Sequence, residues 1–377
     1  MASFGHGGNI KEISRNTGLD YKNIIDFSAN INPLGMPSSV KKAIIEGIDE
    51  IEKYPDITYF ELKKAIANYE NKNYEDLLNK KDICKDSNKK TIYIKEEDLI
   101  LGNGAAEVLF NVVRGTNPKK VLVLAPTFSE YEEATRAVDG EIIYYNLKEE
   151  NNFTIQEDIL DIIDYNLDLI FICNPNNPTG VVTYKGILEK ILIKAKDNNV
   201  ILIMDESFLD FIEEDMSMIS YINEYDNLII IKSLTKLFAL PGIRIGYGVC
   251  RNNEIKYKVN KISPAWNINI LAEIATKTAL KDKSYIKETL EFIKNEKEYL
   301  YNELRKLEQI KVYTPSANFI LLRTLKNIDL KNQLLKHNIL VRSCSNYEGL
   351  NGTYYRVAIR NHCENIKLVA VLKKIIG

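Results

Sequence analysis

The sequence has few of the residues that bind metals. It contains three histidines in 377 residues, and its five cysteines lie so far apart that no two have the CxxC spacing of a zinc site. We therefore expect no bound metal. Scattered, unpaired cysteines favour reduced thiols in a cytoplasmic protein.

Excess charge and long apolar runs are also missing. The net charge is -2, so no basic surface is predicted for nucleic acid or for an acidic membrane. No apolar run approaches the roughly 20 residues of a membrane helix, and the first residues lack the apolar stretch of a secretory signal. We expect a cytoplasmic globular protein with neither nucleic acid nor membrane as a partner.

Short apolar runs recur along the middle of the chain, separated by stretches with helical periodicity. They cover residues 121–126, 169–175, 200–206 and 228–233. Continuous apolar strands that alternate with amphipathic helices predict an α/β fold with a mostly parallel sheet covered on both faces. Ligands bind such sheets beyond the carboxyl ends of the strands.

A second, smaller domain is predicted towards the C-terminus. A long amphipathic helix is expected over residues 284–308, and strands are expected at 317–323 and 354–360. The lysine-rich stretch 79–97 reads as a surface excursion whose role stays open. The expected division is an N-terminal arm with part of the small domain (1–35), a large domain (36–269) and a C-terminal small domain (270–377).

The segment "SLTKLFALPGIR" follows a predicted strand and contains Ser233, Lys236 and Arg244. A lysine forms Schiff bases when its surroundings lower its pKa. Serine and arginine suit a phosphate monoester, with the arginine as a bidentate clamp. A reactive lysine beside a phosphate site suggests pyridoxal phosphate, although Lys236 taken alone could be an exposed surface cation.

Three other segments fit a phosphorylated pyridine cofactor. The loop "GNGAAE" at 102–107 opens a helix whose free amides can hold a phosphate. Asp205 ends an apolar strand and either pairs with a pyridine nitrogen or caps a helix. The turn at 174–180 either aims Asn177 at the cofactor or is a plain β-turn. Phe128 either stacks on the ring or packs in the core.

In this order and spacing the segments resemble the fold-type-I pyridoxal-phosphate enzymes of the class I/II aminotransferase superfamily. The motifs "SLTKLFALPGIRIG" and "NPNNPTG" carry the likeness, which covers nearly the whole chain. The resemblance implies a large, mostly parallel sheet domain, a smaller α+β domain, pyridoxal 5'-phosphate and a homodimer. It implies that Lys236 is catalytic and binds the cofactor covalently. The other implied cofactor contacts are Asp205 at the pyridine nitrogen, Asn177 near the 3-oxygen, Phe128 on the ring, and Ser233, Arg244, Gly104 and Ala105 at the phosphate.

Within that superfamily, three stretches resemble the decarboxylases of L-threonine O-3-phosphate in cobalamin biosynthesis, which are related to the histidinol-phosphate aminotransferases. The stretches are "HGGNIKE", "DFSANINPLG" and "VRSCSNYEGL". A phosphorylated amino acid has two anionic groups, which arginines, a histidine and free amides can bind. The substrate residues implied by the resemblance are His6, Gly7, Asn30, Asn177, Arg342 and Arg356. For the glycine-rich start, the alternative is a frayed tail.

Two positions refine the expected activity. Aminotransferases of this superfamily usually carry a tyrosine where this chain has Phe208, as the decarboxylases do, which argues against ordinary transamination. Tyr54, in "KYPD", is expected to reach the cofactor phosphate of a partner subunit, since a phenol is a good phosphate donor. The alternative is a tyrosine packed at the turn before Pro55.

The leading expectation is decarboxylation of L-threonine O-3-phosphate to (R)-1-amino-2-propanol O-2-phosphate. A histidinol-phosphate-type aminotransferase and a decarboxylase of L-serine O-phosphate remain alternatives, because a single methyl group discriminates by only about 1–3 kcal/mol. A cofactor-binding regulatory module is a third class. Such regulators usually carry a DNA-binding domain, whereas this sequence starts directly at the arm.

Overall fold

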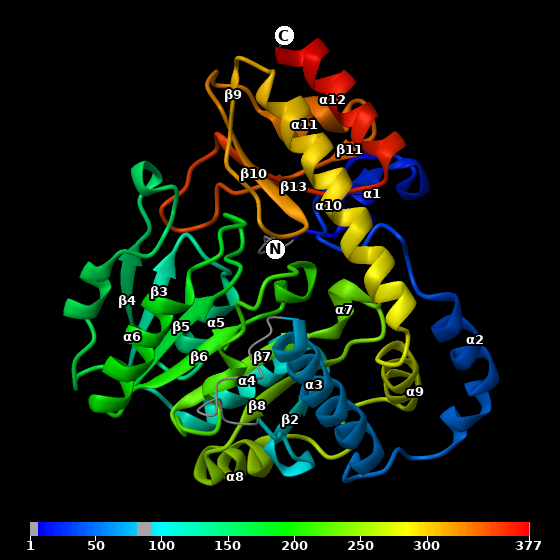
Figure 1. Ribbon diagram of the computed structural model, residues 1–377. Coiled ribbons are helices and arrows are strands. Elements are labelled where there is room, and N and C mark those ends of the chain that lie inside the picture. The colour runs from blue at the N-terminus through cyan, green and yellow to red at the C-terminus, as the bar shows by residue number, and fades with distance from the viewer. Residues whose placement is uncertain (1–6, 81–91, 377) are drawn as a thin grey trace.

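The apolar runs form the core of a seven-stranded sheet, which occupies the lower part of Figure 1. The computed structural model describes residues 7–80 and 92–376. In spatial order the strands are β2 (Leu99–Gly102), β8 (Gly246–Cys250), β7 (Leu228–Ser233), β6 (Ile201–Asp205), β5 (Leu169–Cys173), β3 (Lys120–Ala125) and β4 (Glu141–Asn146).

The sheet is mostly parallel, as predicted. Strands β4, β3, β5, β6 and β7 run parallel to one another, whereas β8 is antiparallel to both β7 and β2. Along β7, Leu228 and Ile230 belong to one apolar cluster, and Ile229 and Ile231 belong to another. This alternation places successive side chains on opposite faces and explains why the strands are apolar throughout.

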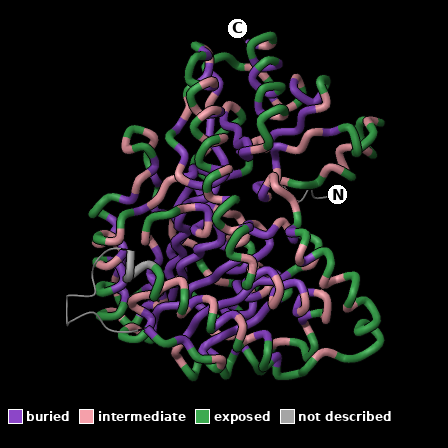
Figure 2. Tube along the Cα trace, turned by 45° about the vertical axis from the view of Figure 1, so that its right-hand side comes forward, coloured by how far each residue is buried: buried purple, intermediate pink, exposed green. Residues whose placement is uncertain are grey.

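Helices cover both faces of this sheet, so the strands are buried beneath exposed helical surfaces (Figure 2). One face packs against apolar side chains of α4 (Ala105–Thr116), α5 (Glu130–Arg136) and α8 (Asn253–Ile262). The other face packs against α3 (Phe60–Lys80) and α6 (Lys185–Asp197). The fold class predicted from the alternating pattern is therefore confirmed.

The smaller part is a four-stranded antiparallel sheet at the top of Figure 1, with helices packed beside it. The strand order is β12 (Arg342–Ser343), β13 (Tyr354–Ala358), β10 (Phe319–Thr324) and β9 (Ile310–Val312). The expected long helix is α10 (Lys283–Arg305), which begins at a cap where the side chain of Asp282 accepts a hydrogen bond from the amide of Tyr285.

The start of the chain joins this smaller part. Strand β1 (Ile25–Asp26) pairs in parallel with β11 (Ile339–Leu340). The proposed domain limits at residues 35 and 269 stay a prediction. The remaining helices are α1 (Ile10–Thr17), α2 (Ser38–Glu46), α7 (Leu234–Leu237), α9 (Ile270–Ala279), α11 (Leu330–Leu335) and α12 (His362–Ile376). Among the described residues, no helix is both long enough and apolar enough to cross a membrane.

A buried charge cluster lies behind the carboxyl ends of β6 and β7. The Lys232 ammonium is 3.1 Å from Oε2 of Glu70 on α3 and 4.0 Å from Oε2 of Glu206. The hydroxyl of Tyr247 donates to Oε1 of Glu70. Lys232 precedes Ser233 in the sequence, and Glu206 follows Asp205. Ser233 and Asp205 line the cavity described next, so the buried cluster holds the ends of β6 and β7 together beside the candidate site.

Candidate active site

A cavity of about 600 Å³ lies at the carboxyl ends of the central strands. Its walls combine the ends of β5, β6 and β7 with the beginning of α4, the segment after β1 and the small sheet. Eleven of the predicted site residues line it, together with Phe208: Gly7, Asn30, Ala105, Phe128, Asn177, Asp205, Ser233, Lys236, Arg244, Arg342 and Arg356.

Lys236 lies on the short helix α7, which starts directly after β7. The pKa of Lys236 is lowered to about 8, mainly because burial removes the hydration of its ammonium group. The nearby positive charges of Arg244 and Arg356 contribute to this lowering, whereas Asp205 acts in the opposite sense. Near neutral pH a far larger fraction of this lysine is therefore uncharged than for an ordinary lysine, and the uncharged amine is the nucleophilic form.

Asp205 ends β6, and both of its carboxylate oxygens have partners. Oδ1 accepts the amide hydrogen bond of Ser207 at 2.9 Å, and Oδ2 accepts a hydrogen bond from the hydroxyl of Tyr131 at 2.7 Å. Tyr131 is fully buried and stacks on Phe171, with ring centroids 4.7 Å apart. The carboxylate is thus held in one orientation at the cavity wall.

The loop before α4 brings bare backbone close to Arg244. Gly104 has φ 92°, and a Cβ atom on it would lie 2.3 Å from Nη2 of Arg244. A Cβ atom on Gly246 would lie 2.3 Å from the amide nitrogen of Ala105. Only glycine allows the backbone to come this close at each of the two positions. As a result, the free amides at the start of the twelve-residue helix α4 lie beside the guanidinium of Arg244.

Ser233 stands on the same side of the cavity. Its hydroxyl is 2.9 Å from that of Thr235, which is also buried and lines the cavity. Two hydroxyls, a guanidinium and the first amides of a helix form a donor set suited to a phosphate monoester.

Arg356 projects from β13 towards the large sheet. Its Nη1 donates to Oδ1 of Asn177, and its Nη2 donates to the carbonyl of Ser28 at 2.7 Å. The third nitrogen, Nε, is buried and has no partner among the described residues. Both amide atoms of Asn30, which is 4% exposed, also lack partners there. Unpaired buried polar atoms around a cavity indicate that a polar ligand completes their hydrogen bonding.

Arg342 enters the cavity beside Arg356 from β12. Its guanidinium lies over the ring of Tyr347, 5.1 Å from the centroid, and Nη2 donates to Oδ1 of Asn346 at 2.7 Å. Phe208 forms an apolar part of the wall, since its ring meets that of Phe319 edge-on at 5.0 Å.

Of the other predicted site residues that the structure describes, Gly104 and Tyr54 do not line this cavity. Gly104 acts at its edge through the approach to Arg244 described above. His6 lies outside the described residues, so its proposed substrate contact stays a prediction. Tyr54 is 81% exposed, with its ring 4.9 Å from that of Trp266, and does not line the cavity of its own chain.

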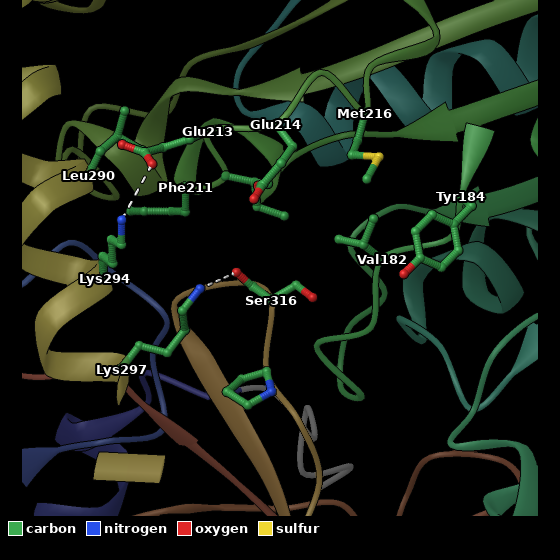
Figure 3. Close-up of a pocket in the computed structure, with 12 residues that line it drawn as sticks. Val182, Tyr184, Phe211, Glu213, Glu214, Met216, Leu290, Lys294, Lys297 and Ser316 are labelled. Carbon is green, nitrogen blue, oxygen red and sulfur yellow. Dashed lines mark hydrogen bonds and ion pairs between the residues drawn. The ribbon is translucent and has the colours of Figure 1, made fainter. Parts of the chain in front are cut away.

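A second cavity, of about 530 Å³, lies between α10 and the loop at 211–216 (Figure 3). Lys297 donates to the carbonyl of Ser316 at 2.7 Å, and Lys294 is 3.9 Å from Glu213. None of the predicted site residues that the structure describes lines this cavity, and both of its lysines already have partners. We therefore place the candidate site in the first cavity.

Comparison with known proteins decides the family. The family "Aminotransferase class I and II" matches residues 22–372. The chain belongs to this family. Threonine-phosphate decarboxylase of Salmonella typhimurium is 36% identical over 372 residues, covering 98% of this chain and 96% of that protein. Histidinol-phosphate aminotransferase of Methanosphaera stadtmanae is 29% identical over 377 residues, covering 98% and 95%.

A solved structure of the same family agrees in fold. The histidinol-phosphate aminotransferase from Clostridium acetobutylicum superposes with a TM-score of 0.82 at 35% identity, covering 93% of this chain and 98% of that chain. The family and fold predicted from the motifs are confirmed. Relatives with two different reactions match at full length, so membership alone does not distinguish decarboxylation from amino transfer.

The cofactor of these enzymes is pyridoxal 5'-phosphate, and the cavity fits it. The loop at Gly104 has no room for a side chain, and the hydrogen-bond donors beside this loop suit the cofactor phosphate. A carboxylate and a lysine of lowered pKa stand in the same cavity. The roles of the individual residues stay predictions.

Sequence reasoning missed several residues of this site, notably Tyr131, Thr235, Tyr347 and the Asp26–Ser28 turn. Tyr131 carries a signal that could have been used. It lies three positions after Phe128, and the two rings meet edge-on with their centroids 5.7 Å apart. Tyr347 and the turn at 26–28 lie within two of the stretches that carry the resemblance, but their contacts depend on how distant segments meet.

Proposed function

We propose that the protein is a pyridoxal-phosphate-dependent lyase that decarboxylates L-threonine O-3-phosphate to (R)-1-amino-2-propanol O-2-phosphate, as in cobalamin biosynthesis. The observation that carries the proposal is the meeting of Arg342 and Arg356 with Lys236 in one cavity. Two guanidinium groups suit a substrate with both a carboxylate and a phosphate. The relative at 36% identity, named threonine-phosphate decarboxylase, supports the same substrate.

The cofactor would be held by residues from both edges of the cavity. Lys236 would bind it covalently, and Asp205 would face the ring nitrogen and keep a proton there. Asn177 would lie near the 3-oxygen and Phe128 against the ring. Ser233, Arg244 and the amides of Gly104 and Ala105 would bind the phosphate. When bound, pyridoxal phosphate supplies an electron-withdrawing ring that stabilises negative charge developing at the substrate Cα.

The residues on the substrate side decide which bond to Cα is broken. The bond that stands perpendicular to the ring plane is the one that the ring activates. Arg356 is fixed by Asn177 and Ser28, so a carboxylate bound to it has a set orientation. Arg342, Asn30 and Gly7 would receive the phosphate, and His6 is expected to join them. The ammonium form of Lys236 would donate the proton that replaces the carboxylate at Cα, leaving the neutral amine.

Phe208 favours decarboxylation over amino transfer. Its ring meets Phe319 and offers no hydroxyl group to the cavity. A tyrosine at this position would donate a hydrogen bond to the 3-oxygen, as expected in aminotransferases. The alternatives are a histidinol-phosphate-type aminotransferase, favoured by the full-length relatives of that name, and a decarboxylase of L-serine O-phosphate.

One assay separates these functions. The purified holoenzyme is incubated with L-threonine O-3-phosphate, with L-serine O-phosphate, and with L-histidinol phosphate plus a keto acid. The proposal expects carbon dioxide from threonine phosphate in stoichiometric amounts with the phosphorylated amine. Formation of a keto product without carbon dioxide release would instead identify an aminotransferase.

The same proposal includes a homodimer. Around Tyr54 the surface exposes many large apolar side chains, whereas a monomer normally keeps such patches small. The exposed residues are Ile45, Ile48, Ile51, Ile57, Phe60 and Trp266. A second copy covering this surface would bring Tyr54 to the partner's cofactor phosphate.

A further inference from the structure

The turn at residues 26–28 opens the "DFSANINPLG" segment, and the proposed function uses it only through the contact of Ser28 with Arg356. Nevertheless Asp26, Ser28, Gly7, Gly8 and Arg356 all line the same cavity. We propose that Asp26 is a positioning residue, which fixes both Arg356 and the backbone of Gly7 and Gly8 through Ser28. The inference rests on the proposed function in taking Arg356 as a substrate-binding residue.

A single carboxylate oxygen holds the turn. Oδ1 of Asp26 accepts the amide hydrogen bond of Ser28 at 2.8 Å and the hydroxyl hydrogen bond of Ser28 at 2.5 Å. These two contacts fix the backbone of Ser28 and the direction of its hydroxyl. Because the hydroxyl hydrogen points at Asp26, the oxygen is left as an acceptor.

Ser28, held in this way, accepts hydrogen bonds from two other groups. Its Oγ accepts the amide hydrogen bond of Gly8 at 2.8 Å. Its carbonyl oxygen accepts the hydrogen bond from Nη2 of Arg356 at 2.7 Å. Ser28 is only 2% exposed, so neither contact faces strong competition from water.

The approach of Gly7 shows how tightly the two segments meet. A Cβ atom on Gly7 would lie 2.0 Å from the carbonyl oxygen of Ser28 and 3.4 Å from Nη2 of Arg356. The backbone of Gly7 therefore rests on the same carbonyl that orients the guanidinium. A shift of Ser28 would move both of the groups that are proposed to meet the anionic parts of the substrate.

Substitutions at Asp26 can separate the role of Oδ1 as a hydrogen-bond acceptor from the role of the negative charge. Asparagine keeps an oxygen at the Oδ1 position and removes the charge, whereas alanine removes the acceptor. Ser28→Ala keeps the amide bond to Asp26 and the carbonyl bond to Arg356 but deletes the contact with Gly8. Three variants thus remove three different parts of the arrangement.

The test uses the holoenzyme and the absorbance of its cofactor during titration with L-threonine O-3-phosphate, followed by steady-state kinetics. We expect Asp26→Ala to weaken binding roughly 10-fold and to raise KM more than it lowers kcat, because the acceptor oxygen that positions Ser28 is lost. Ser28→Ala should weaken binding about 3-fold, and Asp26→Asn should stay within about 2-fold of the wild type. The absorbance of the substrate-free enzyme should be unchanged in all three.

Ser39 provides a matched control, since its hydroxyl donates to Oδ2 of Asp282 at 2.6 Å outside the cavity. Ser39→Ala should bind substrate as the wild type does. Any one of three results would overturn the proposal. The first is unchanged binding in Asp26→Ala, and the second is binding by Asp26→Asn that is as weak as binding by Asp26→Ala. The third is an equal effect of Ser28→Ala and Ser39→Ala. If Asp26→Ala fails to fold, Ser28→Ala and Asp26→Asn still decide it.

The proposed function can fail separately. An enzyme that binds threonine phosphate without releasing carbon dioxide refutes the decarboxylase assignment, yet the titrations still measure the part played by Asp26. If the wild type binds only L-histidinol phosphate, the same variants are titrated with that compound and the same ranking is expected.

Discussion

The hydroxyl of Tyr131 and the carboxylate of Asp205 form a buried hydrogen bond of 2.7 Å between residues 74 positions apart in the sequence. Burial, and then the nearby Asp205 carboxylate, raise the pKa of Tyr131 well above its usual range. The phenol therefore remains a neutral donor throughout the working pH range, and Asp205 keeps its orientation towards the cavity.

Tyr131→Phe should preserve the stacking on Phe171 and delete only this hydrogen bond. A bond to a charged acceptor contributes about 1.5–3 kcal/mol, so we expect kcat/KM to fall roughly 10- to 100-fold with a shift in cofactor absorbance. Tyr145→Phe is the matched control, because Tyr145 donates to Asp158 away from the cavity. A Tyr131→Phe enzyme with wild-type spectrum and activity would show that Asp205 needs no such support.

Lys236→Ala should leave a protein that binds the cofactor without fixing it covalently. Borohydride should attach the cofactor permanently to the wild type and not to the variant, and turnover by the variant should be negligible. Lys297→Ala, which alters a lysine of the other cavity, should behave as the wild type in both measurements. Appreciable turnover by Lys236→Ala would reject the assigned role.

The pH dependence of cofactor uptake follows from the same lysine. Its pKa is lowered from 10.5 to about 8, so the reactive neutral amine is the minor form below pH 8 and the major form above it. Reconstitution of the cofactor-free protein should accelerate about 10-fold per pH unit below pH 8 and level off above it. Arg356→Gln removes a positive charge that lowers this pKa, so the midpoint should move to higher pH. A midpoint near 10.5 in the wild type would contradict the effect of burial.

Phe208→Tyr should restore a hydroxyl near the 3-oxygen of the cofactor. We expect a shift in visible absorbance and a larger share of amino-transfer product relative to carbon dioxide. Phe211→Tyr, on the next turn of chain and outside the cavity lining, serves as a control. An unchanged spectrum and product ratio in Phe208→Tyr would reduce this residue to a packing role against Phe319.

Mixed dimers test whether Tyr54 acts in the partner's site. Chains with Lys236→Ala and chains with Tyr54→Ala are each expected to be impaired. A dimer of one chain of each kind contains one site with an intact lysine and an intact tyrosine, provided the tyrosine comes from the partner. The isolated mixed dimer should then have roughly half the activity of the wild-type dimer, since one of its two sites is intact. Activity no higher than that of Tyr54→Ala chains would place Tyr54 in its own subunit or outside the site.

Local patterns were sufficient to predict the central strands and the motifs at their ends. The apolar runs ending at Asp205 and Ser233 were recognisable because strands buried on both faces lack polar alternation. The residues that meet across the cavity were not recognisable in this way. Whether the Ser28 carbonyl reaches Arg356, 328 positions away, depends on how the small sheet docks. The antiparallel placement of β8 likewise leaves no mark in its own apolar sequence.

The buried cluster of Lys232, Glu206 and Glu70 acts as a check on strand alignment. Strand β6 leads into two successive carboxylates, and side chains alternate between faces, so a slip of one residue would exchange Asp205 and Glu206. The slipped arrangement would still present a carboxylate to the cavity, but the shorter side chain of Asp205 would replace that of Glu206 behind the sheet. Glu206 accepts hydrogen bonds from the hydroxyl of Ser217 at 2.7 Å and from the amide of Met218 at 2.8 Å. Each buried donor left without its partner costs about 1–3 kcal/mol. Misalignment therefore costs free energy on the face of the sheet opposite the cavity. The position of Asp205 at the candidate site thus depends on buried contacts that never touch the substrate.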